Sequence, residues 1–340
     1  MSDTRADQAT AFLAANGWGN AARVNIAGDA SNRRYDRLRN TDGHCVVLMD
    51  APPAKGEDVR PFVHITQALR AHGLSAPEVI AQDAEHGFLL LEDLGDALFA
   101  KVVQADPTLE LPLYQAAVDV LVHLHRSAPP ALAPYDAATM TPLAALAFDW
   151  YLPGTTGAPD PAAKAAFEVA CQTALVPLDS ALDVMIQRDY HAENLLLLPD
   201  RNGIARVGLL DYQDAMRGHR AYDLVSILQD ARRDVPAPLA RDMILRYVTK
   251  ADLDPEPFTT AYACLGMQRN MRILGVFARL SMAYGKPHYV DLIPRVWGHL
   301  MTALDHPALA EVAPRITDVL PAPTDDLLAR LRDKCGSVPL

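Results

Sequence analysis

The sequence predicts an α+β fold in which a small antiparallel sheet precedes a mostly helical region. Up to residue 95 the pattern is strand, strand, strand, helix, strand, strand, and most of the later apolar periodicity is helical. The 340 residues, half of them hydrophobic and 21% charged, are enough for one large domain or two modest ones with a sizeable core.

The expected elements of the first part are separated by clear turn signals. Gly28 to Asn32 and Asn40 to Gly43 supply turn residues, and Gly73 ends a stretch of helical spacing. The elements are, in order, a helix at 3–16, strands at 23–27, 34–39 and 45–50, a helix at 57–72, and strands at 79–82 and 87–91.

The second part is expected to be helical apart from one hairpin. Two short β runs at 195–198 and 207–210 flank a Pro-Asp-Arg-Asn-Gly turn and predict this hairpin. The proline-rich stretch 129–142 is expected to be a connector or surface loop. The expected helices are 111–126, 141–152, 160–180, 220–231, 236–249, 256–284, 289–304 and 323–333.

Charge and cysteine content exclude several classes of protein. Lys and Arg number 31 against 42 Asp and Glu, and the net charge of -11 argues against binding to nucleic acid or to an anionic membrane surface. The four cysteines form no CxxC pair, so we expect reduced, mostly buried thiols. With neither a signal peptide nor an apolar run long enough to span a membrane, the chain is expected to be cytoplasmic.

The sharpest chemical signal is the segment QRDYHAENL at 187–195. Asp189 is followed five positions later by Asn194, then by the expected hairpin, and then by Asp211 at the end of an apolar run. Kinases arrange phosphoryl transfer with this pattern, because an Asp accepts the proton of the substrate hydroxyl while an Asn and a second Asp hold Mg²⁺. We therefore expect Asp189 to be the catalytic base, and Asn194 and Asp211 to be metal ligands. The alternative is a hairpin with ordinary turn-type Asp and Asn residues.

Several segments resemble the aminoglycoside phosphotransferase and choline kinase branch of the protein-kinase-like fold. Asp189 to Asn194 resembles the loop H-G-D-x-x-x-x-N of that family, with Gln187 and Arg188 where His and Gly usually stand. Further matching segments, which together cover most of residues 20–300, are LLLEDL at 89–94, LVHLH at 121–125, LDYQD at 210–214 and YDL at 222–224, whose Asp usually has a structural role. The resemblance implies two lobes divided near Gly95. The N-lobe, 1–95, would bind ATP with its sheet and helix, and the C-lobe, 96–340, would carry the catalytic loop, the metal site and the acceptor-binding helices.

The resemblance also implies which residues contact the nucleotide. The segment GDASNRRY at 28–35, with a single Gly, would be the hairpin loop over the ATP phosphates, where hydroxyl and backbone N–H groups meet phosphate. The candidate nucleotide-binding residues are Ser31, Asn32, Arg33, Arg34, Glu92 and Leu94.

The third strand departs from the family pattern. Met49 stands where a Lys or Arg should pair with the phosphates and with a helix Glu, for which Glu57 is a candidate. Either the chain is a nucleotide-binding pseudokinase, or the positive charge comes from Arg33 or Arg34, which strand alternation directs to opposite faces. The presence of Asp189, Asn194 and Asp211 together argues against a silent module.

Within the family, the segments 30–35, 47–53, 87–95 and 187–191 resemble a bacterial subgroup of sugar kinases. These enzymes act on N-acetylmuramate and N-acetylglucosamine in the recycling of peptidoglycan from the cell wall, and a Met in the third strand belongs to their pattern. The resemblance implies transfer of the γ-phosphoryl group of ATP to the C1 hydroxyl, which gives a sugar 1-phosphate.

The acceptor site is the least specified part of the sequence. A sugar acceptor needs hydrogen-bonding groups and a surface for stacking. The lactyl carboxylate of muramate favours an Arg, and Arg269 and Arg272 are candidates for it besides the two arginines of the following list. The candidates chosen for substrate binding are Asp149, Trp150, His191, Gln213, Asp214, Arg232 and Arg233. A kinase for another small alcohol, of the aminoglycoside, choline or homoserine type, stays an alternative, because this region offers both acids and arginines.

Overall fold

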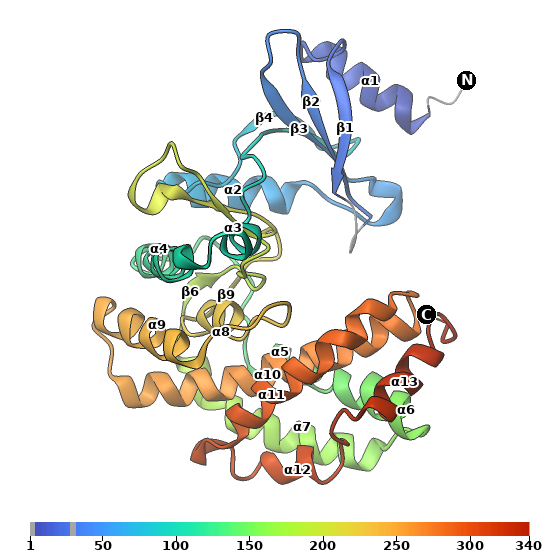
Figure 1. The fold of residues 1–340 in the computed structure, drawn as a ribbon, viewed down its shortest axis with the longest axis vertical. Coiled ribbons are helices and arrows are strands. Elements are labelled where there is room, and N and C mark those ends of the chain that lie inside the picture. The colour runs from blue at the N-terminus through green and yellow to red at the C-terminus, as the bar shows by residue number, and fades with distance from the viewer. Residues whose placement is uncertain (1–3, 28–31, 340) are drawn as a thin grey trace. The chain divides into compact units, whose positions relative to one another are not determined.

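A computed structural model describes residues 4–27 and 32–339 of the chain. Contacts group the chain into two compact units. The first unit is Met1–Val120 with Ala192–Ala215, and the second is Leu121–His191 with Met216–Leu340. The expected α+β class is confirmed, with an antiparallel sheet followed by a mostly helical region (Figure 1). The lobe boundary at Gly95 stays a prediction, since the contact grouping also places 96–120 and the hairpin with the sheet.

A five-stranded antiparallel sheet forms the beginning of the first unit, with the strand order β1-β2-β3-β5-β4. All of its expected strands and both expected helices are present. They are α1 (Arg5–Ala15), β1 (Ala22–Ala27), β2 (Arg34–Arg39), β3 (Cys45–Asp50), α2 (Arg60–Ala71), β4 (Val79–Asp83) and β5 (Phe88–Glu92).

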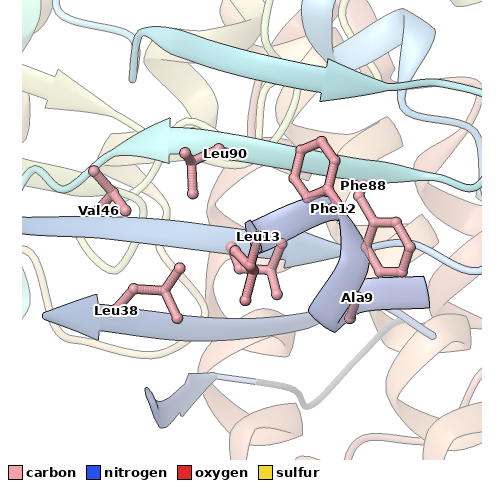
Figure 2. Packing of buried hydrophobic residues seen from close by; sticks show 8 residues of the cluster. Ala9, Phe12, Leu13, Leu38, Val46, Phe88 and Leu90 are labelled. Carbon is pink, nitrogen blue, oxygen red and sulfur yellow. The ribbon is translucent and has the colours of Figure 1, made fainter. Parts of the chain in front are cut away.

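Helix α1 covers one face of this sheet (Figure 2). Phe12 stacks on Phe88 of β5 with ring centroids 5.6 Å apart, and Leu13 belongs to the same buried cluster. The strands contribute every second residue to this cluster, including Leu48 and Leu90, because successive side chains of a strand point to opposite faces. The odd-numbered residues of β3 therefore face away from α1, and this second face is where the nucleotide is expected.

The rest of the first unit supports the second hairpin. Strands β7 (Leu195–Leu197) and β8 (Val207–Leu209) pair antiparallel, as expected. The backbone of Ser75 bridges to Gly208, and that of Leu98 to Leu196. Helix α3 (Phe99–Ala105), which the sequence analysis did not predict, precedes α4 (Glu110–Leu124).

The second unit is organised around α10, a 28-residue helix that runs from Pro255 to Met282. A short antiparallel pair, β6 (Leu182–Ile186) and β9 (Met216–His219), precedes and follows the inserted segment of the first unit in the sequence. The other helices are α5 (Ala137–Ala144), α6 (Leu152–Thr156), α7 (Pro161–Leu175), α8 (Tyr222–Leu228), α9 (Ala237–Lys250), α11 (Ile293–Leu304), α12 (Ala313–Thr317) and α13 (Asp325–Asp333). Single 3₁₀ segments lie at Pro53–Lys55, Pro107–Leu109, Val176–Ala181, Gly203–Arg206, Pro287–Leu292 and Pro307–Leu309, and a π-helical turn at Ala147–Tyr151.

Three expectations for the second part were wrong in detail. The connector at 129–142 contains the start of α5, whose N-cap Asp136 accepts a hydrogen bond from Thr139 N at 2.9 Å. The helix expected at 141–152 is interrupted by the π-helical turn, and the one at 160–180 leaves α-helical geometry after Leu175, before Pro177. Strands β6 and β9 were not predicted, because short runs carry little periodicity.

Two further expectations concern the whole chain. Cys171 and Cys264 are buried as expected, while Cys45 and Cys335 are half-buried. Over residues 4–27 and 32–339, no helix combines the length and the apolar character that crossing a membrane requires.

We expect Gly275→Ala to destabilise the protein by about 3 kcal/mol, through overpacking against a rigid backbone. A Cβ at Gly275 of α10 would lie 2.3 Å from the carbonyl carbon of Leu146, next to the π-helical turn. The control is Gly298→Ala in α11, where a Cβ meets no atom within 4 Å. This second change should stabilise the helix by about 0.5–1 kcal/mol. Urea unfolding measures both, and equal effects of the two changes would contradict the close approach.

Candidate active site

The backbone around the expected catalytic base is held by one buried carboxylate. Asp223, at the start of α8, is fully buried, and its two oxygens accept hydrogen bonds from Gln187 N at 2.7 Å and Arg188 N at 2.9 Å. The carbonyl of Arg188 in turn accepts hydrogen bonds from Ser226 Oγ at 3.2 Å and Arg269 Nη1 at 3.1 Å. These bonds fix the peptide units directly before Asp189.

This fixation maintains an unusual backbone conformation. Arg188 has a φ of 71°, in the left-handed region that favours glycine, and Asp211 has a φ of 57°. Together with Asp252 they are the non-glycine residues with positive φ in the described chain, so two of the three lie in the expected catalytic motifs. Strained backbone of this kind often accompanies functional sites.

Asp189 lies in a strongly cationic environment. Burial alone would raise the pKa of its carboxyl, but the charges of Arg269 and Arg272, with His191 and Arg188, lower the pKa below its ordinary value. The carboxylate is therefore ionised at neutral pH and able to accept a hydrogen bond or a proton from a hydroxyl group.

Arg188, Arg269 and Arg272, here called the arginine cluster, are ordered by two buried tyrosines. The guanidinium carbon of Arg188 lies 5.2 Å from the ring centroid of Tyr135, and that of Arg269 lies 5.7 Å from the ring centroid of Tyr222. Arg272 is hydrogen-bonded to Tyr222, and the two rings meet edge to face at 5.0 Å. Burial would raise the pKa of Tyr222, but Arg269 and Arg272 lower it overall, which shows how strong the local positive field is.

His191 and Arg232 are brought together in the second unit. His191 is buried, and its Nε2 lies 3.3 Å from Arg232 Nη1. Burial, reinforced by the charge of Arg232, lowers the pKa of His191 to about 4, so the imidazole is neutral at physiological pH. Arg232 N donates to the buried Asp230 at 2.9 Å, and Arg233 is half-buried beside it.

The two expected metal ligands lie together in the first unit. Asn194 Nδ2 donates to Asp211 Oδ2 at 3.4 Å, and Leu210 N donates to the carbonyl of Asn194 at 2.9 Å. Gln213 Nε2 donates to the other oxygen, Asp211 Oδ1, at 2.8 Å. The carboxylate of Asp211 is thus oriented by two side-chain amides.

Helix α2 holds the position of Asp211 through the residue that follows it. The ring of Tyr212 stacks on Phe62 with centroids 5.1 Å apart, and its hydroxyl lies 2.6 Å from Thr66 Oγ1. Both contacts are buried, so the aromatic residue next to Asp211 anchors the end of β8.

The donor set fits a magnesium ion. Asn194 offers an amide oxygen and Asp211 a carboxylate, the amide nitrogen of Asn194 is directed to Asp211, and Asp211 is exposed. Mg²⁺ prefers hard oxygen ligands and takes only one or two carboxylates from protein, with the remaining ligands coming from water and phosphates.

On the nucleotide side, Arg33 and Glu57 form an ion pair. Arg33 Nε donates to Glu57 Oε2 at 2.7 Å, and Asn32 N donates to Glu57 Oε1 at 3.2 Å. Asn32 Nδ2 also donates to the carbonyl of Lys55 at 3.2 Å. Ser31, a further candidate in this loop, lies outside the described residues.

Tyr35 is affected electrostatically both by this ion pair and by Asp211. Burial raises the pKa of Tyr35 to about 12, with Arg33 acting to lower it and the negative charge of Asp211 acting to raise it. Tyr35 is opposite Met49 in the register of β2 and β3, so Tyr35 and Met49 share one face of the sheet.

Arg34 points to the other face, as strand alternation predicted. It is opposite Asp50, which forms an ion pair with Arg5 of α1 at 2.6 Å. With these residues and Arg23, Arg34 lines a hollow of about 470 Å³ on the α1 side of the sheet. Of the two arginines, Arg33 is therefore the one on the side of Met49.

Other candidates are engaged in contacts that the sequence did not indicate. The carboxylate of Glu92 forms ion pairs with Arg201 and with Arg70, the latter at 3.5 Å. Leu94 is half-buried. On the π-helical turn, Asp149 accepts hydrogen bonds from Lys164 Nζ at 2.7 and 2.8 Å, and the neighbouring Trp150 is half-buried. Asp214, which follows β8, is exposed.

Sequence reasoning did not assign roles to Arg188, Tyr135 or Tyr222. For Arg188 a signal was present, because an arginine stands where the related loop usually has glycine. The two tyrosines belong to segments far apart in the sequence and are brought together only by the fold.

This fold and these motifs define a phosphotransferase. The chain belongs to the phosphotransferase enzyme family, whose sequence model matches residues 23–257. Among solved structures, a choline/ethanolamine kinase family protein from Mesorhizobium loti superposes with a TM-score of 0.58 at 15% identity, covering 97% of this chain and all of that one. The choline kinase LicA from Streptococcus pneumoniae superposes with a TM-score of 0.60 at 13% identity, covering 87% of this chain and 99% of that one. At these identities the similarity shows the fold.

Relatives of higher identity carry a more specific name. A protein of Caulobacter vibrioides is 37% identical over 92% of this chain and 96% of its own length, and one of Pseudomonas aeruginosa is 35% identical over 88% and 90%. Both are named N-acetylmuramate/N-acetylglucosamine kinase. The family and these relatives make the chain a small-molecule kinase.

We expect Asp223→Asn to lower kcat on the order of 10²-fold, because the peptide units before Asp189 lose an acceptor that fixes them. The free energy of unfolding should also fall by about 1–3 kcal/mol, since a buried N–H is left without its partner. Ser226→Ala is the matched control and should have a smaller effect, because Arg269 still donates to the same carbonyl. Steady-state kinetics and urea unfolding measure both variants, and full kcat in Asp223→Asn would contradict the positioning role.

Proposed function

We propose that this chain transfers the γ-phosphoryl group of ATP to the C1 hydroxyl of N-acetylmuramate and N-acetylglucosamine in peptidoglycan recycling, with Mg²⁺ as cofactor. Four relatives with this pair of sugars in their names are 32–37% identical to the chain and cover 81–92% of it. The single structural observation that carries the choice of acceptor is the arginine cluster around Asp189.

The sign of this charge separates the acceptor classes. Aminoglycosides and choline are cations, and an acceptor hydroxyl at Asp189 would place their positive charges near Arg188, Arg269 and Arg272. Like charges repel strongly in a partly buried site of low effective dielectric constant. A neutral or anionic sugar meets no such penalty, so the cluster favours N-acetylglucosamine and N-acetylmuramate over the cationic acceptors, aminoglycosides and choline, that composition alone left open.

Asp189 acts as the base in this proposal. Its lowered pKa keeps it ionised, so that it orients the C1 hydroxyl and accepts its proton late in the transfer. An anomeric hydroxyl is more acidic than an ordinary alcohol, and a weakly basic carboxylate is therefore sufficient.

Asn194 and Asp211 would hold the magnesium ion. When bound, Mg²⁺ neutralises charge on the phosphates during phosphoryl transfer. The chain itself keeps the Asp211 carboxylate oriented through Gln213 and keeps its backbone in place through Tyr212.

Arg33 would supply the positive charge that Met49 does not. It lies on the same side of the sheet as Met49, and Glu57 holds it much as a helix Glu holds the strand Lys in related kinases. Both side chains of this ion pair are largely buried, with 14% and 13% of their surface exposed, which gives the pair a defined geometry. Together with Asp189, Asn194 and Asp211, this pair argues for an active kinase rather than a pseudokinase.

An ADP-release assay with Mg²⁺ and ATP tests the proposal on N-acetylmuramate, N-acetylglucosamine, homoserine, choline and an aminoglycoside. We expect turnover of both N-acetyl sugars, with a new phosphate ester at C1 in the phosphorus NMR spectrum. Asp189→Ala should lower kcat by about 10²–10⁴-fold, as expected for loss of a general base. Asp242→Ala, which removes an exposed carboxylate from α9, is the control. Absence of turnover with both N-acetyl sugars would reject the proposed acceptor. Full activity of Asp189→Ala would reject the proposed role of Asp189 as the base.

Arg33→Met should raise the KM for ATP by about 10- to 100-fold, because a charge-assisted contact with phosphate is lost. Arg34→Met should raise it less, since Arg34 faces α1. Glu57→Gln should raise the KM for ATP by an intermediate amount, because a neutral Gln side chain holds Arg33 less firmly than Glu57 does. The KM for ATP, measured at saturating acceptor, distinguishes these cases. An unchanged KM in the double variant of Arg33 and Arg34 would show that neither arginine contacts the nucleotide.

A further inference from the structure

Arg188 occupies a backbone conformation that glycine would adopt without strain. Its φ of 71° brings the Cβ of an L-residue close to the backbone. The fold nevertheless holds it there with hydrogen bonds from both sides of the residue, to Asp223 and from Ser226 and Arg269. The related loop of the family usually has glycine at this position. A strained non-glycine residue next to the proposed catalytic base points to a functional constraint at this position, which the side chain of Arg188 could supply.

The side chain of Arg188 is placed for contact with a substrate at Asp189. Its guanidinium carbon lies 5.2 Å from the ring centroid of Tyr135, which limits its freedom, and the residue is half-buried rather than enclosed. Its charge is among those that lower the pKa of Asp189. Arg188 therefore lies near the carboxylate that would receive the C1 hydroxyl.

The other members of the cluster have structural tasks. Arg269 is 5% exposed and donates to the carbonyl of Arg188, and Arg272 is hydrogen-bonded to Tyr222. Among these three arginines, Arg188 is the one that directly precedes Asp189 in the chain, and it is the one whose backbone is in the left-handed conformation that favours glycine.

We propose that Arg188 binds the lactyl carboxylate of N-acetylmuramate and sets the preference for this sugar over N-acetylglucosamine. This inference rests on the proposed function. The two sugars differ by a lactyl ether on the oxygen of C3, and a single ring carbon separates C3 from C1. When the C1 hydroxyl is at Asp189, the carboxylate falls within reach of the neighbouring side chain. A planar guanidinium binds a carboxylate through two parallel hydrogen bonds, and the hydroxyl of N-acetylglucosamine offers no such partner.

Arg188→Gly tests this role, because glycine relieves the backbone strain while removing the guanidinium. We expect the ratio of kcat/KM for N-acetylmuramate to that for N-acetylglucosamine to fall by about 10- to 100-fold, as for loss of a charge-assisted contact. Arg188→Lys keeps a positive charge but lacks the planar guanidinium, so its ratio of kcat/KM for the two sugars should be intermediate. The midpoint of thermal unfolding of Arg188→Gly should not fall.

The methyl ester of N-acetylmuramate keeps the lactyl group but lacks the charged carboxylate. Comparing acid and ester therefore tests whether Arg188 recognises the carboxylate rather than the rest of the sugar. With the natural chain the ester should be a poorer substrate than the acid by about the same 10- to 100-fold, whereas Arg188→Gly should treat acid and ester alike. Asp252→Gly, which relieves a left-handed residue just after α9 and outside the candidate site, is the control and should keep the ratio of the natural chain.

Three outcomes would overturn the inference. They are an unchanged ratio in Arg188→Gly, an equal loss for both sugars, which would assign Arg188 to the transferred phosphoryl group, and a continued preference of Arg188→Gly for the acid over the ester. Failure of the natural chain on both sugars would instead reject the proposed function.

Discussion

The backbone of the segment that carries Asp189 depends on the buried carboxylate of Asp223. Its two oxygens accept hydrogen bonds from consecutive backbone amides, Gln187 N and Arg188 N. Together with the bonds that Ser226 and Arg269 donate to the Arg188 carbonyl, they hold the left-handed conformation at Arg188. Burial raises the pKa of Asp223 to about 6, so ionising it in the interior is costly, and the two N–H donors and the charge of Arg269 offset that cost. The geometry of the backbone before Asp189 therefore depends on a buried Asp223 carboxylate whose charge is compensated by these two N–H groups and by Arg269.

The distribution of positive charge explains how an acidic chain can serve anionic substrates. The net charge of -11 averages over the whole surface, whereas the proposed reaction would depend on the local field of a few arginines held in defined positions. In the second unit, two tyrosine rings and the backbone carbonyl of Arg188 order the arginine cluster around Asp189. In the first unit, Glu57 holds Arg33. In both places the partner residue restricts a long, flexible arginine side chain, so that its positive charge is held at a defined position.

Much of the fold followed from local patterns. The five strands and the hairpin before Asp211 were predicted because turn residues separate short β-type runs, and α10 because its apolar positions recur over many turns. Strands β6 and β9 were not predicted, although β6 leads directly into Gln187. Each is too short to show a period, and each forms only because the other, thirty residues away in the sequence, supplies its hydrogen bonds.

The spacing of Asp189, Asn194 and Asp211 in the sequence was enough to predict the class of reaction, because phosphoryl transfer needs these residue types in this order. Only the tertiary structure decided which arginines lie where. It directed Arg34 toward α1 and Arg33 to Glu57, and it engaged Asp149 with Lys164. It also placed Arg188 in a left-handed conformation with its guanidinium over the ring of Tyr135. The physical reason is that a motif fixes the chemistry of a residue, whereas the direction and charge environment of its side chain depend on partners from distant segments.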